Sequence, residues 1–299
     1  MLAWIAYLPL TWVHFAGAAV GWLAYALSPD YRRRVQENAA LAGVAAADVR
    51  RAVAEAGRMS AEVPWLWFRP ESRPLGKLVR WDSSPVVAAA VAAGRPLLFL
   101  TPHLGSFEVS ARAYAERFGA QQPITVLYRP AKKAWLADIQ ATARQRPGMD
   151  VAPATLAGVR LMLRALKRGH SVGLLPDQVP PEGQGVWAPF FGRPAYTMTL
   201  AARLAQQTGA VLAVVWCERL PRGAGFVFHE RPLGVSLPSL KDAGEAFDLQ
   251  AASAINQAME GLIREAPGQY LWGYNRYKPP RAAAPPTAPA PAAPPKVDA

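Results

Sequence analysis

Short apolar runs and amphipathic segments alternate along the middle of the chain. Apolar runs bounded by turn residues predict buried strands at residues 97–101, 124–128, 171–175 and 210–218. Helical spacing of apolar residues predicts helices at residues 48–68, 131–146, 155–168, 197–208 and 246–265. This alternation is typical of an α/β fold, here with a central, largely parallel mixed sheet flanked by helices.

The first part of the chain has a different pattern. Residues 2–27 contain no Asp, Glu, Lys or Arg, and aromatic residues punctuate an aliphatic run that ends before Arg32, Arg33 and Arg34. This length predicts a single N-terminal membrane helix, and the arginine cluster predicts that the rest of the chain is cytoplasmic. Pro9, Thr11 and His14 lower the hydrophobicity, so a helix that lies in the membrane surface or packs on the rest of the protein is the alternative.

These patterns divide the chain into three parts. Residues 1–30 are predicted to be a membrane anchor helix, and residues 31–278 form one α/β domain. Residues 279–299 are almost wholly Pro and Ala, which predicts a disordered tail with no catalytic role.

Composition narrows the range of partners. The chain has 299 residues, 52% of them hydrophobic, which is enough for a sizeable core. Its formal net charge of +12 favours anionic partners: a phospholipid surface, a phosphorylated substrate, an acidic protein or nucleic acid. The single Cys217 cannot form an internal disulfide, and its apolar surroundings predict a buried side chain.

A histidine and a carboxylate follow the first predicted strand of the sheet. Residues 102–108 read Pro-His-Leu-Gly-Ser-Phe-Glu, which places His103 at the carboxyl edge of the sheet and Glu108 in the first turn of a helix. Ligands bind at this edge in open α/β sheets, so His103 is a candidate general base whose ring Glu108 orients. The alternative is a structural histidine and an ordinary acidic residue that the helix dipole favours.

Other chemistries find less support in the sequence. Ser106 lacks a Gly-x-Ser-x-Gly elbow, Cys217 lies mid-strand, and His14, His170 and His229 lie in less suitable segments than His103. The sequence has neither a zinc-ligand cluster nor a glycine-rich phosphate loop, and the aromatic residues do not form a basic stacking face for nucleic acid. We therefore expect no metal, no bound cofactor and no nucleic-acid partner.

Four further blocks follow the His-x4-Glu box in order. They are Tyr-Arg-Pro at residues 128–130, Leu-Leu-Pro-Asp-Gln at 174–178, Pro-Phe-Phe-Gly-Arg-Pro-Ala at 189–195, and the closing segment 269–278. With these blocks the chain resembles the lysophospholipid acyltransferase superfamily, and within it the lipid A biosynthesis branch of late acyltransferases. The resemblance covers most of residues 1–278.

The resemblance implies an O-acyltransferase of the bacterial inner membrane. The expected reaction moves a fatty acyl chain from acyl carrier protein to a hydroxyl on a hydroxyacyl chain of a lipid A precursor. The expected partners are acyl carrier protein, the lipid A precursor and the anionic lipids of the inner membrane. His103 is then the general base, Glu108 its orienter, and Arg129 the residue that holds an acceptor phosphate. Asp177 matches the acidic position of the third block, where it either orders the loop or contacts the substrate. Phe190, Phe191 and Arg193 are candidates for the lining of a lipid cleft, with the hydrophobic core as the alternative place for two adjacent phenylalanines.

Several alternatives remain open on sequence grounds. Glycerolipid enzymes have Glu-Gly-Thr-Arg where residues 177–180 read Asp-Gln-Val-Pro, which favours the lipid A branch. The second enzyme reading is acylation of a lysophospholipid or another glycolipid from acyl-CoA. A third is a membrane-associated hydrolase of thioesters or esters, and a fourth is a membrane-anchored binding protein. Arg129 also has the alternative reading of a surface arginine.

Overall fold

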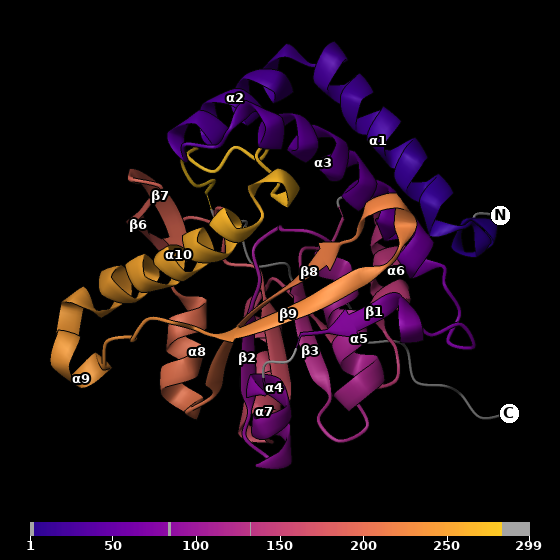
Figure 1. Ribbon diagram of the computed structural model, residues 1–299. Helices are drawn as coiled ribbons and strands as arrows, with labels where there is room; N and C mark the ends of the chain where they lie inside the picture. The colour runs from indigo at the N-terminus through magenta and orange to yellow at the C-terminus, as the bar shows by residue number, and fades with distance from the viewer. Residues whose placement is uncertain (1–2, 83–84, 132, 283–299) are drawn as a thin grey trace, which may run out of the picture.

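The protein forms an α/β fold with one large mixed sheet, as the sequence predicts (Figure 1). The structure is a computed structural model and describes residues 3–82, 85–131 and 133–282. The predicted tail therefore lies outside the described residues from position 283 onwards. The assignment of residues 1–30 and 31–278 to separate units stays a prediction.

The large sheet has the strand order β1-β9-β8-β2-β5-β3-β4. Strands β8, β2, β5, β3 and β4 run parallel, whereas β9 pairs antiparallel with β8 and parallel with β1 at one end. A hairpin of β6 and β7 stands apart from this sheet. The strands are β1 (Val79–Trp81), β2 (Leu97–Leu100), β3 (Ile124–Tyr128), β4 (Met149–Pro153), β5 (Ser171–Leu174), β6 (Gly185–Phe190), β7 (Arg193–Met198), β8 (Val211–Arg219) and β9 (Phe226–Pro232).

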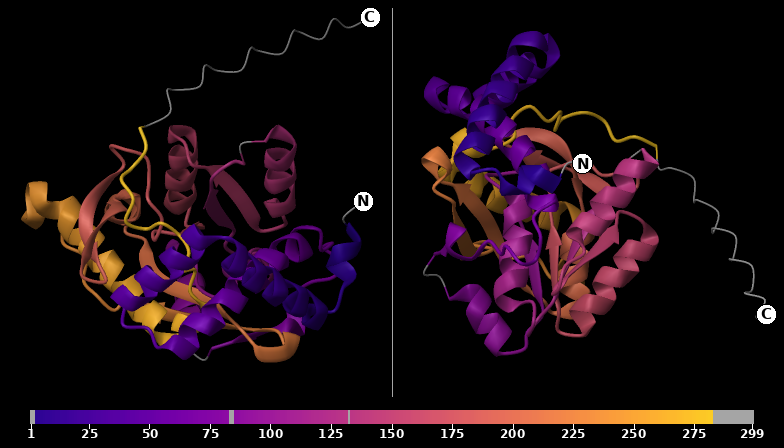
Figure 2. Two further views of the ribbon diagram at one scale, coloured as in Figure 1. Left: turned by 90° about the horizontal axis from the view of Figure 1, so that it is seen from above. Right: turned by 90° about the vertical axis from the view of Figure 1, so that its right-hand side faces the viewer.

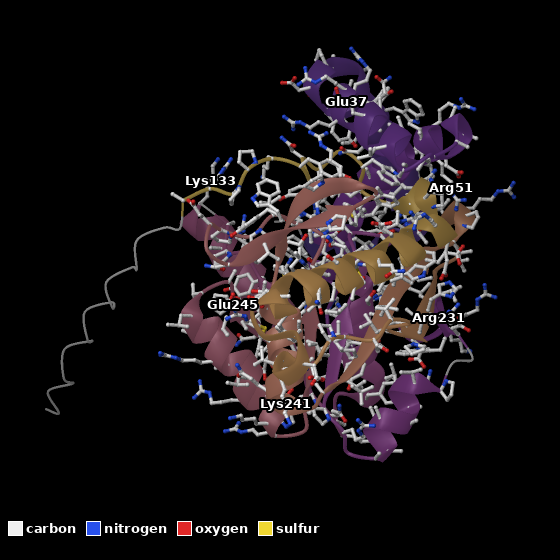
Figure 3. All side chains as sticks on the ribbon, turned by 90° about the vertical axis from the view of Figure 1, so that its left-hand side faces the viewer. Glu37, Arg51, Lys133, Arg231, Lys241 and Glu245 are labelled. Carbon is white, nitrogen blue, oxygen red and sulfur yellow. The ribbon has the colours of Figure 1, made fainter. Side chains whose placement is uncertain are left out.

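Helices cover both faces of the sheet and one of its edges (Figures 1 and 2). They are α1 (Leu10–Leu27), α2 (Pro29–Leu41), α3 (Ala46–Trp67), α4 (Val86–Ala92), α5 (Phe107–Phe118), α6 (Ala134–Arg144), α7 (Leu156–Lys167), α8 (Leu200–Thr208), α9 (Leu240–Ala243) and α10 (Phe247–Glu265). Short 3-10 turns occur at Ala3–Tyr7, Gly76–Leu78, Pro221–Gly223, Gly244–Ala246 and Pro267–Gln269. Charged side chains such as Glu37, Arg51 and Lys241 project outwards from the helices (Figure 3).

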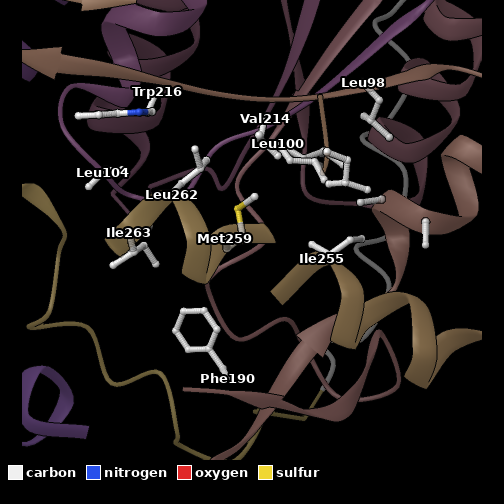
Figure 4. Packing of buried hydrophobic residues seen from close by; sticks show 14 of the residues in the cluster. Leu98, Leu100, Leu104, Phe190, Val214, Trp216, Ile255, Met259, Leu262 and Ile263 are labelled. Carbon is white, nitrogen blue, oxygen red and sulfur yellow. The ribbon is translucent and has the colours of Figure 1, made fainter. Parts of the chain in front are cut away.

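Alternation along each strand creates two hydrophobic cores, one on each face of the sheet. Leu98 and Leu100 of β2 pack with α7, α8 and the apolar face of α10 (Figure 4). Leu97 and Phe99 point to the other face, where they pack with α4, α5 and the C-terminal part of α3. Both faces are buried because successive side chains of a strand point to opposite sides. This is why the central strands read as continuous apolar runs.

The four predicted strands and five predicted helices are confirmed, with ends shifted by up to three residues. Residues 197 and 198 were expected to begin a helix but instead end β7, and the helix starts at Leu200. The β6–β7 hairpin turns at Phe191 and Gly192, whose φ angles are 47° and 75°. A phenylalanine at positive φ carries no turn signal in sequence, which explains why the hairpin was not predicted.

Helix α1 packs lengthwise on α3 (Figure 1). Gly17 and Gly21 meet Gly57 so closely that a Cβ at Gly57 would lie 2.0 Å from the carbonyl oxygen of Gly17. The outer face remains apolar and exposed, with Trp12 66% and Phe15 73% accessible. Among the described residues, α1 is the helix long and apolar enough to cross a membrane. The apolar segment before Pro9 is a short 3-10 turn instead of a continuation of this helix.

Candidate active site

Three sequence blocks meet at the carboxyl edge of the sheet. His103 follows β2, Asp177 follows β5 and Arg129 follows β3. Strand β5 lies between β2 and β3, so the loops after these strands are neighbours in space although they are far apart in sequence. The edge of adjacent parallel strands is where α/β folds bind ligands.

The side chain of His103 is held between Asp177 and Gln178. Its Nδ1 lies 2.8 Å from Oδ1 of Asp177, and its backbone N–H donates to Oδ2 of the same carboxylate at 2.8 Å. Its Nε2 lies 3.0 Å from the amide nitrogen of Gln178. Because a carboxylate accepts and an amide N–H donates, this network assigns the proton to Nδ1 and the lone pair to Nε2. His103 and Gln178 both line one cavity.

Asp177 is buried, with 2% of its surface accessible. Burial raises the pKa of its carboxyl, but the charge and hydrogen bonds of His103, together with the charge of Arg276, outweigh burial and hold that pKa below its usual value. Asp177 therefore remains ionised at neutral pH.

Glu108 does not make the contact with His103 that the sequence predicted. Its carboxylate forms a two-point ion pair with Arg144 of α6, through Nη2 and through Nε at 3.2 Å. The guanidinium of Arg144 lies over the ring of Trp67, 4.8 Å from its centroid. Glu108 does line the same cavity as His103, but Asp177 is the carboxylate that orients the imidazole.

Backbone hydrogen bonds fix the loop between β2 and α5. The carbonyl of His103 accepts from Leu271 N, Gly105 N donates to Gln269 O, and Ser106 N donates to Cys217 O. Gly105 has φ +60°, and a Cβ there would lie 2.0 Å from Cys217 O, so glycine is required at this position. The closing segment of the chain thus braces the loop that carries His103.

A cavity of about 740 Å³ opens around His103. Its lining residues fall into two groups by the face of the sheet on which they lie, and we call these two groups its lobes. One lobe lies on the face that α5 covers and includes Phe99, Tyr114, Gly173 and Phe228. The other lobe is lined by residues of α7 and α8 on the opposite face, among them Leu156, which is 67% accessible. His103 and Gln178 line the same cavity.

The remaining predicted site residues are divided between the cavity and other places. Arg129 is exposed and lines the cavity mouth. Arg193 is exposed too, but it does not line this cavity, and its guanidinium stacks over Tyr277 at 4.8 Å. Phe190 and Phe191 belong to the core instead of the cavity wall. Cys217 is buried as predicted, and burial raises the pKa of its thiol to about 12, which opposes a role as a nucleophile.

Sequence reasoning missed Arg144 and the role of Gln178. Arg144 lies in the predicted helix 131–146, but nothing in the spacing indicates that it reaches Glu108, 36 residues earlier. Gln178 was visible only as a departure from the glycerolipid block, adjacent to Asp177. That departure was the one available signal. Gln178 is the residue whose side-chain amide contacts Nε2 of His103.

Comparisons with known proteins identify the family of this chain. A family model described as bacterial lipid A biosynthesis acyltransferase matches residues 1–279. The chain is 28% identical to a lipid A biosynthesis lauroyltransferase of Escherichia coli (strain K12) over 74% of this chain and 68% of the relative. It is 26% identical to a palmitoleoyltransferase of lipid A biosynthesis from the same strain, over 74% and 68% of the two chains. A lipid A biosynthesis acyltransferase of Shigella flexneri matches with the same identity and coverage. The chain therefore belongs to the bacterial lipid A biosynthesis acyltransferase family and is an acyltransferase.

Proposed function

We propose that this enzyme transfers a fatty acyl chain from acyl carrier protein to a hydroxyl on a hydroxyacyl chain of a lipid A precursor, with His103 as the general base. The observation that carries the mechanism is the His103–Asp177 pair, whose geometry leaves Nε2 as the hydrogen-bond acceptor of a ring that lines the cavity. The names of the relatives support the lipid A precursor as the acceptor.

The reaction needs one proton acceptor and one site for negative charge. Nε2 of His103 takes the proton of the acceptor hydroxyl as its oxygen attacks the thioester carbonyl carbon, which forms a tetrahedral oxyanion. Asp177 stabilises the imidazolium. When the C–S bond breaks, His103 returns the proton to the departing thiolate, and the ester remains on the acceptor. In this scheme the acceptor hydroxyl replaces the Gln178 amide at Nε2.

Two kinds of donor are available for negative charge. The first turn of α5 begins four residues after His103, and the leading N–H groups of a helix lack intrahelical partners. They suit the oxyanion. Arg144 and Arg129 also line the cavity and suit an acceptor phosphate, because a guanidinium binds phosphate through two parallel hydrogen bonds. In this arrangement Glu108 positions Arg144.

The two lobes suit two different hydrocarbon chains. The lobe beneath α5 is enclosed by buried residues, among them Phe99 and Tyr114, and its β3 wall runs from Ile124 to Tyr128, about 13 Å at 3.3 Å per residue. We assign it to the single acyl chain of the donor. The lobe between α7 and α8 reaches the surface at Leu156, and we assign it to the acceptor, whose several chains need an open groove.

We further propose that α1 lies in the membrane surface instead of crossing it. One of its faces is occupied by α3 through the glycine contacts, and the opposite face presents Trp12, Phe15, Leu23 and Leu27 to the outside. An apolar stripe at helical spacing on a docked helix fits a membrane interface. The net charge of +12 suits both anionic lipids and an acidic carrier protein.

Product analysis tests this function. Purified protein is incubated with the lipid A precursor and with acyl groups on either acyl carrier protein or coenzyme A, and the products are read by mass spectrometry. Precursor that gains one acyl chain, formed faster from acyl carrier protein, supports the proposal. Free fatty acid as the main product with acceptor present would favour a hydrolase. Acylation of a lysophospholipid but not of the lipid A precursor would mean that a lysophospholipid is the acceptor.

A further inference from the structure

A buried arginine contacts the loop that carries His103. Arg219 ends β8, is 2% accessible, and donates from Nη2 to the carbonyl of Gly105 at 3.0 Å. This carbonyl lies between His103 and Glu108 in the chain. Arg219 thus completes the set of backbone bonds that Leu271, Gln269 and Cys217 make to the same loop.

Two carboxylates of α3 hold the guanidinium in place. Nη1 donates to Glu55 at 2.6 Å, and Nε and Nη2 donate to the two oxygens of Glu62 at 2.5 and 2.7 Å. Glu55 and Glu62 are two helical turns apart, so they share one face of α3. Burial raises the pKa of Glu62, but the charge and hydrogen bonds of Arg219, followed by those of His14, outweigh burial and lower it to about 2. Glu62 and Arg219 therefore form an ionised pair.

Helix α1 joins this network through His14. Its Nε2 lies 2.6 Å from Oε1 of Glu62, and the imidazole is 4% accessible. His14 lies one helical turn before Gly17, which is in close contact with Gly57 of α3. A continuous chain of contacts therefore runs from α1 through Glu62 and Arg219 to Gly105.

We propose that Arg219 is a positioning residue for the loop that carries His103, and that His14 ties helix α1 into that arrangement. The physical reason is that the buried guanidinium cannot move without breaking three charge-assisted hydrogen bonds to Glu55 and Glu62, so it fixes the Gly105 carbonyl more firmly than a neutral donor would. Helix α1 then contributes to turnover as well as to membrane contact. Only the rate readout below rests on the proposed acyl transfer.

Arg219→Lys tests the first part. Lysine keeps the charge but cannot reach Glu55, Glu62 and the Gly105 carbonyl together. We expect kcat to fall about 10- to 100-fold with little change in KM, because small displacements of a catalytic group have effects of this size. Hydrogen exchange at the Gly105 and Ser106 amides should rise. Arg112→Lys is the matched control, since Arg112 is also buried and bonded to a carboxylate and backbone carbonyls, but not to this loop.

His14→Ala tests the link to α1 and stands in if Arg219→Lys does not fold. We expect faster exchange in residues 103–106 and a lower kcat, with both restored towards wild type in His14→Gln, whose amide can donate to Glu62. If hydrogen exchange of the loop amides were the same as in wild type in both folded Arg219→Lys and folded His14→Ala, the inference would be overturned. So would a loss of kcat in Arg112→Lys as large as in Arg219→Lys. Wild-type enzyme that acylates no acceptor would refute the proposed function while leaving the exchange result interpretable.

Discussion

The carboxylate of Asp177 lies 2.8 Å from Nδ1 of His103, although 74 residues separate them in the chain. The two residues follow β2 and β5, which are neighbours in the sheet. The same carboxylate also accepts the backbone N–H of His103, so it fixes both the ring and the loop. One buried anion therefore determines where the base stands and which nitrogen carries its proton.

The acyl lobe makes a prediction about chain length. Gly173 of β5 lines the lobe beneath α5, and a Cβ there would meet Val126 Cγ1 at 3.3 Å and Ile124 Cδ1 at 3.6 Å. Gly173→Val should fill part of the lobe and shift donor preference towards shorter chains. The loss should be at least about tenfold in kcat/KM for the longest accepted donor, because a single methylene in a hydrophobic pocket already changes kcat/KM by about 10- to 200-fold.

Competition between donors of different length measures this shift. Leu163→Phe is the matched control, because Leu163 lines the other lobe and should change acceptor use instead. If Leu163→Phe changed the preferred donor length and Gly173→Val did not, the donor chain would occupy the lobe between α7 and α8, and the acceptor the lobe beneath α5.

The pKa of Glu62 predicts how stability depends on pH. Because this pKa is about 2 in the folded protein and 4.5 without perturbation, ionised Glu62 stabilises the fold above pH 4.5. This contribution should disappear as the pH falls from about 4.5 towards 2. Removing one partner of a buried ion pair costs about 3–5 kcal/mol, so Glu62→Gln should be destabilised by this order at pH 7.

Urea unfolding at pH 7 and pH 3 compares the two proteins. The difference between wild type and Glu62→Gln should be clearly smaller at pH 3. A difference that stays constant or grows on acidification contradicts the assigned pKa.

The exposed face of α1 predicts how the protein binds lipid. Trp12→Ser with Phe15→Ser should weaken binding to vesicles of anionic phospholipid at least about tenfold, since burying one large apolar side chain contributes about 1.5–3 kcal/mol. Arg33→Gln with Arg34→Gln should mainly reduce the dependence of binding on salt. Vesicle flotation at two salt concentrations separates these effects. Unchanged binding of the Trp12 and Phe15 variant would mean that another surface meets the membrane.

The fold was largely predictable because its central strands are short apolar runs with clear turn signals. The meeting of His103, Arg129 and Asp177 at one edge followed from parallel strands that all end there. The partner of His103 was not predictable, because it depends on β2 lying beside β5, and strand order leaves no local trace in sequence. Glu108 is nearer in the chain, but α5 directs its carboxylate to Arg144.

The same limit applies to buried ion pairs. Arg219 is 157 residues from Glu62, and no local pattern in the sequence links the end of a strand to a helix face so far away in the chain. Helix α1 was predicted from its apolar composition. Its contact with α3 was not, because it depends on Gly17, Gly21 and Gly57, whose shared role appears only when the helices are packed.

The pair of His103 and Asp177 is tested most directly by the acylation rate of purified variants at saturating donor and acceptor. His103→Ala and Asp177→Asn should each lower kcat by about 10²- to 10⁴-fold in folded protein. His229→Ala is the matched control, because His229 also pairs with an aspartate, Asp82 at 3.1 Å, but lies outside the cavity lining. The account predicts near wild-type kcat for His229→Ala. A folded His103→Ala enzyme that acylates the lipid A precursor at the wild-type rate would contradict it.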